Sequence, residues 1–182
     1  MLDSMPIVVA KGVRSNHASV ARELCNKGYC SSQQMYYYGV KLHVLGQKRY
    51  QALPLPVLLL ITPASENDLT TAKGFLPSFH GLDIYADKIY RNTDWQKLLL
   101  LENQIEIFTP VKLAIGQKSL DSADKLYSLA VSRTRQAIES FFAWIQEKTN
   151  IQSASKVRSP SGLLSFVFAR ISAICLLLDY CF

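Results

Sequence analysis

An acidic residue, Asp87, follows a short apolar run that has the alternation of a β-strand. Within this run Leu82, Ile84 and Ala86 alternate with more polar neighbours, which is the period of a strand. A carboxylate at the carboxyl end of a central strand points into the crevice where open α/β sheets place their chemistry. Asp87 is therefore a candidate catalytic residue. The alternative is that Asp87 only opens the following turn, and the stretch by itself favours that simpler role.

Two further acids, Asp3 and Glu139, could form a metal site together with Asp87. Glu139 lies in the segment 124–148, whose apolar residues recur at helical spacing, and Arg135 lies beside it one turn earlier. Phosphoryl transfer with two divalent ions needs carboxylates that converge from different elements, and Mg²⁺ prefers oxygen ligands. Because the 14 acidic residues offer many triplets, spacing alone does not identify the site.

Cysteine and histidine residues give weaker signals than the acids. Cys25, Cys30 and His43 could be imagined as zinc ligands, but their spacing is poor and a fourth ligand is missing. Reduced cysteines in a cytoplasmic protein are the better interpretation of the four cysteines. A carboxylate site for a hard metal needs no histidine, so we expect the three histidines to be structural. The tyrosines at 36–38 could stack on bases, although half of them should be core in a strand.

Composition predicts one folded, basic domain over residues 1–182. Hydrophobic residues make up 49% of the chain and charged residues 19%, which excludes a disordered protein. The net charge of +6 predicts a polyanionic partner, either nucleic acid or an anionic membrane. No secretory signal peptide is expected at the N-terminus. The apolar run 163–182 approaches membrane-spanning length, but Arg170 and Asp179 interrupt it, and we prefer a core helix to a membrane segment.

The periodicity predicts a mixed α/β sheet flanked by helices. Pro6 should break strand pairing, which places Asp3 where a strand gives way to a turn. Residues 11–32 are expected to be loop-like, with a short helix at 18–24. The further expected elements are strands at 35–45 and 53–61 joined by a hairpin turn at 46–49, a helix ending near 74–77, a helix at 93–103 capped by Thr93, a strand at 104–108, one or two helices over 124–148 and a final apolar helix.

Five local blocks, taken in order, resemble DDE-type transposases of bacterial insertion sequences, which have an RNase H-like catalytic domain. The blocks are Asp3-Ser4-Met5-Pro6, then Gly28-Tyr29-Cys30 with Tyr36-Tyr37-Tyr38-Gly39-Val40-Lys41, then Pro63-Ala64-Ser65-Glu66-Asn67-Asp68, then Tyr85-Ala86-Asp87-Lys88-Ile89-Tyr90, and finally Arg135-Gln136-Ala137-Ile138-Glu139. Single blocks are unspecific, whereas five in this order are specific, and they extend over nearly the whole chain.

The resemblance implies a site and a reaction. Asp3, Asp87 and Glu139 match the family's three catalytic acids, which would bind two Mg²⁺ ions, with Mn²⁺ as the alternative. The implied activity is metal-dependent DNA cleavage followed by strand transfer, in the cytoplasm of a bacterium at the nucleoid. The implied partner is DNA, a homodimer is left open, and no membrane is expected. The expected DNA contacts are Lys88, Arg91, Arg135 and Lys148, and Asp68 would have only a supporting or helix-capping role.

The chain also departs from the family pattern. A helical DNA-binding region and most of the first strand should precede the first acid, so we expect an N-terminally truncated domain. Gln146 occupies the place where a lysine is expected after Glu139, and Lys148 is offset from it. Two alternatives to an active transposase follow: an inactive remnant that at most binds DNA, and an RNase H-like nuclease without strand transfer.

Overall fold

The computed structural model describes residues 1–113, 115–117 and 119–180, with side chains placed as far as Leu178. Its elements in chain order are β1 (Leu2–Lys11), the 3-10 helix η1 (Gly12–Asn16), β2 (Asn26–Cys30), β3 (Met35–Arg49), β4 (Ala52–Pro63), α1 (Asp68–Phe75), η2 (Leu76–Ser78), β5 (Asp83–Tyr85), η3 (Lys88–Tyr90), α2 (Thr93–Asn103), β6 (Glu106–Phe108), α3 (Ser122–Thr149) and α4 (Pro160–Tyr180).

The long strand β3 is the centre of the larger sheet. β1 pairs antiparallel with one edge of β3, while β2 and β4 share its other edge. β5 and β6 form a parallel pair, and a parallel bridge between Leu2 and Ala86 attaches β5 to the free edge of β1. The mixed α/β architecture expected from the sequence is confirmed.

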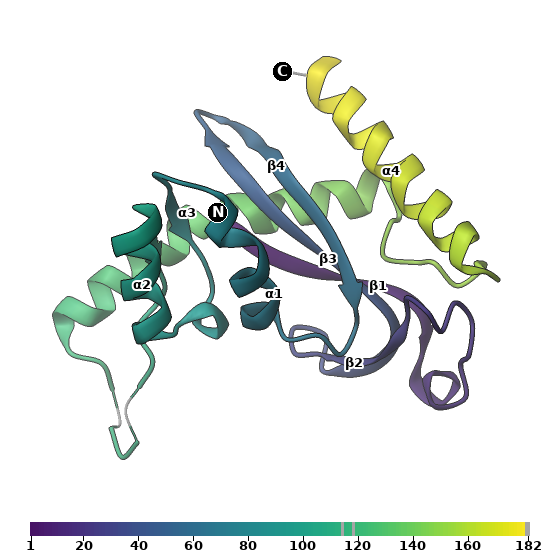
Figure 1. Cartoon of the computed structure of the whole chain (residues 1–182), viewed down its shortest axis with the longest axis horizontal. Helices are drawn as coiled ribbons and strands as arrows, with labels where there is room; N and C mark the ends of the chain where they lie inside the picture. The colour runs from purple at the N-terminus through teal and green to yellow at the C-terminus, as the bar shows by residue number, and fades with distance from the viewer. Residues whose placement is uncertain (114, 118, 181–182) are drawn as a thin grey trace.

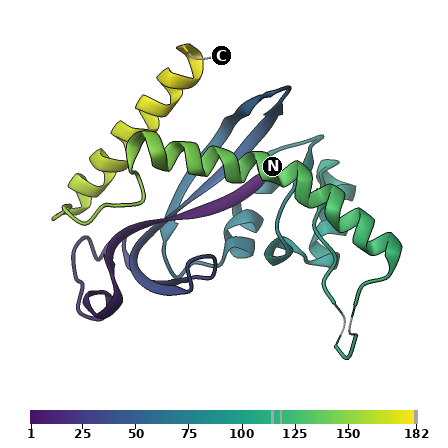
Figure 2. The ribbon, with the colours of Figure 1, turned by 180° about the vertical axis from the view of Figure 1, so that it is seen from behind.

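Helices cover both faces of these strands (Figure 1), and α3 crosses the whole face seen in Figure 2. Strand alternation decides which side chains meet which helix. Met5 and Ile7 of β1 share a buried cluster with Ile138 and Phe141 of α3. Leu2 instead belongs to the cluster that includes α1 and α2 residues. Before the register shift that follows Val8, odd-numbered side chains of β1 therefore point toward α3.

The expectation of a turn near Pro6 is wrong, because β1 continues through this residue to Lys11. Val8 directs its backbone groups away from β3, donating its N–H to Gln152 O (2.8 Å) and accepting from Ala154 N (2.9 Å). By the two-residue alternation of an antiparallel ladder, Pro6 also presents its nitrogen to this outer edge. The missing N–H of Pro6 therefore faces away from β3, and the pairing of Pro6 with β3 is preserved.

Two other local expectations are wrong. The hairpin turn lies at Tyr50 and Gln51 rather than at 46–49, because Gly46 is held in the β1–β3 ladder by reciprocal backbone hydrogen bonds with Met1 (2.7 and 2.8 Å). No helix forms at 18–24; these described residues lie in turns between η1 and the short strand β2. β2 has no strand-like apolar alternation and is defined by its pairing with β3.

The remaining helices agree closely with their predicted positions. α2 spans the expected residues, but Asn92 rather than Thr93 caps it, accepting a hydrogen bond from Trp95 N at 3.0 Å. α3 is one continuous helix of 28 residues.

The strand β4 lies at an edge of the sheet, and its register with β3 shifts near Pro56, in agreement with the expected effect of its prolines.

The C-terminal helix α4 is long and apolar enough to cross a membrane over Pro160–Leu178, by length and composition only, and 22% of that window is buried. Leu163 and Val167 pack into the core that contains α3, and Arg170 donates a hydrogen bond to Thr149 O at 2.9 Å. These contacts support a core helix, which stays a prediction. Cys181 and Phe182, the end of the expected run, lie outside the described residues.

Candidate active site

The guanidinium group of Arg135 joins the three predicted acids. Its Nη2 lies 3.1 Å from Asp3 Oδ2 and 3.7 Å from Glu139 Oε1, and its Nη1 lies 3.6 Å from Asp87 Oδ1. All four residues line one cavity of about 770 Å³. Side chains from β1, from the end of β5 and from α3 are thus brought together, although they are far apart in the sequence.

Strand alternation and helix packing explain why these side chains meet. Ile84 and Ala86 are buried toward α1 and α2, so Asp87, one residue later, points to the α3 side, as Asp3 does. On α3, Ile138, Phe141 and Ile145 are fully buried and fix the rotation of the helix. That rotation directs the neighbouring face of α3, which carries Arg135 and Glu139, into the cavity.

The carboxylate of Asp3 carries an electrostatic cost in this cluster. Burial raises its pKa from 3.8 to about 6, with smaller contributions from the negative charges of Asp87 and Glu139. Arg135 and the backbone N–H of Ser4 oppose this rise in the pKa. The single guanidinium therefore does not fully compensate the negative charge, and the cavity favours additional positive charge.

Metal-free protein should become less stable as the pH rises through the titration range of Asp3. Because the folded state holds this proton more tightly than the unfolded chain, the stabilisation is complete below pH 3.8 and is lost as the pH rises to about 6. The shift corresponds to about 3 kcal/mol at about 1.36 kcal/mol per pKa unit. Between pH 4 and 7, the free energy of unfolding of Asp3→Asn should rise relative to that of wild type by up to this amount, measured by urea unfolding in EDTA. A difference in the free energy of unfolding that stays constant with pH would contradict the raised pKa of Asp3.

A second polar group lies on the wall of the same cavity. Lys41 Nζ contacts Asp68 Oδ1 at 2.9 Å, and the Ser4 hydroxyl donates to Asp68 Oδ2 at 3.1 Å. Asn67, rather than Asp68, caps α1. The hydroxyl of Tyr90 is buried without a hydrogen-bond partner among the described residues, and burial raises its pKa well above 10. Sequence reasoning assigned no role to Ser4, Lys41 or Tyr90, because nothing local indicates partners so distant in the chain.

The other predicted DNA contacts lie outside this cavity. Lys88 and Arg91 are exposed beside Asp87, but neither lines the cavity. Lys148 is exposed near the end of α3, where its Nζ pairs with Glu147 at 2.9 Å. Arg135, in contrast, is buried among the acids. The DNA contacts expected for Lys88, Arg91, Lys148 and Arg135 stay predictions.

His43 lies opposite Ser4 in the β1–β3 ladder, and its expected structural role stays a prediction. His43 is buried and shares a hydrogen bond with Thr62 Oγ1 at 2.8 Å, and burial lowers its pKa to about 4. Within the described ranges, no three His, Cys, Asp or Glu side chains are close enough to hold an ion as they stand. The guanidinium of Arg135 lies between the three acids. Their carboxylate oxygens are nevertheless the ligands that hard divalent cations prefer.

Fold and site together define a mixed α/β protein with a carboxylate cluster assembled from three distant segments. Residues 1–159 match the family described as the transposase DDE domain. The chain belongs to this family, as the five sequence blocks predicted, and the family indicates a transposase acting on DNA. Comparison with curated proteins and with solved structures gave no match. The family match ends one residue before α4 begins at Pro160.

Proposed function

We propose that this chain is the catalytic domain of an insertion-sequence transposase that cleaves DNA and transfers the freed 3′-hydroxyl to a target. Family membership supports the transposase class. The observation that carries the proposal is the convergence of Asp3, Asp87 and Glu139 on the Arg135 guanidinium. An RNase H-like fold is part of the proposal, and the mixed sheet with helices on both faces supports it.

The proposed metal ligands are the same three carboxylates, with Mg²⁺ as the ion and Mn²⁺ as the alternative. Bound in pairs, such ions activate the attacking oxygen and stabilise the leaving oxygen of a phosphodiester. The raised pKa of Asp3 supports this assignment, because a nearby cation would relieve the cost of its buried charge. Metal binding requires Arg135 to give up some of its present contacts with the acids. A DNA phosphate would be a suitable new partner for its guanidinium.

Mg²⁺ should stabilise the folded chain if these acids bind it. At a concentration 100 times the dissociation constant, we expect about 2.7 kcal/mol of added stability, or a rise in Tm of several degrees. The measurement is thermal unfolding in EDTA and across a Mg²⁺ titration. Asp87→Asn should remove most of this rise, whereas Asp83→Asn, at the opposite end of β5, should retain it. An identical Mg²⁺ response in both variants would argue against the site.

The activity itself is tested with the purified chain, supercoiled plasmid and a short duplex that carries a free 3′-hydroxyl. We expect Mg²⁺-dependent nicking and covalent joining of the duplex to the plasmid, both abolished by EDTA. Nicking without joining would instead assign a nuclease. An intact fold with no metal-dependent cleavage would overturn the catalytic proposal.

A catalytically inactive, DNA-binding remnant is the second candidate function. The observation that favours it is the position of Arg135, which already partly neutralises the acids where the ions would bind. In a remnant, this ion-pair cluster would have a structural role only. Mg²⁺ would then change neither unfolding nor cleavage, while DNA binding would persist.

A further inference from the structure

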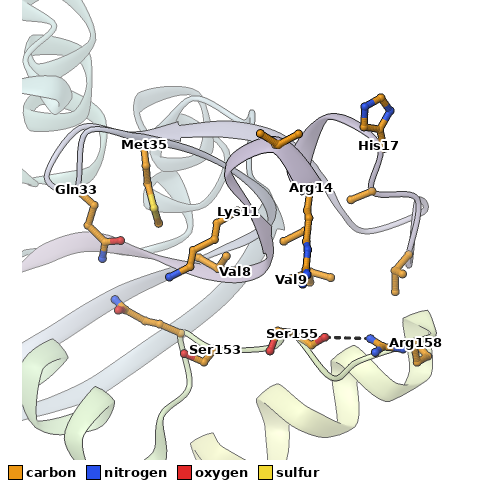
Figure 3. Close-up of a pocket in the computed structure, with 15 residues that line it drawn as sticks. Val8, Val9, Lys11, Arg14, His17, Gln33, Met35, Ser153, Ser155 and Arg158 are labelled. Carbon is orange, nitrogen blue, oxygen red and sulfur yellow. Dashed lines mark hydrogen bonds between the residues drawn. The ribbon is translucent and has the colours of Figure 1, made fainter.

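A second cavity, of about 700 Å³, lies at the far end of β1 from Asp3 (Figure 3). One wall is formed by the end of β1 and by η1, and the other by the segment 152–158. Figure 3 shows Lys11 and Arg14 extending from the first wall toward the segment that carries Ser153, Ser155 and Arg158. We call this cavity the basic cleft.

The lining of the basic cleft is suited to an anion. Three cations line it, Lys11, Arg14 and Arg158, and its described lining includes no aspartate or glutamate. Arg158 uses Nη1 for the carbonyl oxygens of Ser155 and Val157, each at 2.9 Å, which are neutral partners that leave its charge uncompensated. Side-chain amide and hydroxyl groups add further donors. Such a concentration of unopposed positive charge attracts phosphate groups.

The basic cleft adjoins the carboxylate cavity. Gln33 and Gln152 line both cavities. The two walls of the cleft are fixed to each other where Val8 donates to Gln152 O and accepts from Ala154 N. Asp3 and Lys11 lie eight positions apart on the same strand, which at about 3.3 Å per residue spans at most about 26 Å. B-DNA rises about 3.4 Å per base pair, so this distance corresponds to at most about eight base pairs.

We propose that the basic cleft binds phosphates of the DNA duplex whose scissile phosphate lies in the carboxylate cavity, within about eight base pairs of that phosphate. The position of the cut in this proposal rests on the proposed function. The binding of phosphates by the basic cleft does not depend on it. Its contribution is to orient the duplex along β1. Contacts of this kind fix register and carry no base specificity.

The test compares DNA affinity across salt concentrations for wild type and for the double variant Lys11→Gln/Arg14→Gln. Binding of a 30-base-pair duplex is measured by fluorescence anisotropy in EDTA, so that no cleavage occurs. Each phosphate contact contributes about 0.9 to the slope of log K against log salt, so we expect the slope to fall by about 1.8. Near 0.1 M salt this corresponds to a loss of about 10- to 60-fold in affinity. Inorganic phosphate is added as a competitor, and millimolar concentrations should not displace the duplex.

The matched control is Lys97→Gln/Arg133→Gln, which removes the same charge from exposed positions on α2 and α3 outside both cavities. Its slope should stay close to that of wild type. An unchanged slope in the cleft variant, or an equal loss in the control, would overturn the proposal, as would displacement of the duplex by inorganic phosphate. Wild-type protein that shows the expected slopes but never cleaves DNA would contradict the catalytic function and support the cleft. Cleavage by wild type combined with an unchanged slope in the cleft variant would contradict the cleft alone.

Discussion

Replacing Asp87 with asparagine is expected to lower the rate of Mg²⁺-dependent DNA cleavage by about 10³-fold. A bound ion contributes several kcal/mol to stabilising the transition state, and each ~1.4 kcal/mol corresponds to a factor of ten. The asparagine keeps the shape of the side chain and removes its charge. Because the Asp87 side chain is 49% exposed and lies 3.6 Å from Arg135, the fold should be retained.

The control for this prediction is Asp83→Asn on the same strand. Asp83 is exposed at the opposite end of β5 and lines no part of the carboxylate cavity. Cleavage of plasmid is measured at equal concentrations of folded protein, with folding checked by circular dichroism. Equal activity of Asp87→Asn and wild type would remove Asp87 from the catalytic group.

Removing the guanidinium group is expected to give the largest loss of stability among these substitutions. Arg135→Ala would leave the largely buried Asp3 carboxylate, whose side chain is 21% exposed, without its cation. Breaking a fully buried pair costs about 3–5 kcal/mol, so we expect a loss near the lower end, about 3 kcal/mol. The loss, measured by urea unfolding at pH 7.5 in EDTA, should shrink when Asp3→Asn is added. The double variant leaves no unpaired charge at position 3, so the two effects should not be additive.

Arg133→Ala is the matched control for this loss, since Arg133 lies two residues earlier on α3 and is exposed. Its stability should stay within about 0.5 kcal/mol of wild type. If Arg135→Ala unfolded like Arg133→Ala, the ion-pair cluster would be unimportant for the fold. Additive effects in the Asp3 and Arg135 double variant would lead to the same conclusion.

Elements with a clear apolar period were predictable from sequence, because residues close together in the chain carry that period. The stripe formed by Ile138, Phe141 and Ile145 located α3, and the alternation around Ile84 located β5. β2 could not be found in this way, because pairing with β3 rather than its own side chains defines it. The path of β1 through Pro6 depended on which edge of the strand remained unpaired, a property of the whole sheet.

The acids themselves were found through their resemblance to a family, since spacing alone could not distinguish them from other triplets. Their mutual contact through Arg135 is visible only in three dimensions. The same is true of the Lys41–Asp68 pair, whose members belong to β3 and α1. The basic cleft was equally hidden, because Arg14 and Arg158 come from opposite ends of the chain.

The origin of the three acids from β1, the end of β5 and α3 has a consequence for synthesis on the ribosome. Chains emerge N-terminus first at about 5–20 residues per second, so both aspartates appear before the helix that carries the glutamate. A partly made chain that lacks α3 therefore has an incomplete set of the three acids. If the proposed function holds, DNA cleavage would require α3 to be made and to pack onto the sheet, because only then would Glu139 join the two aspartates.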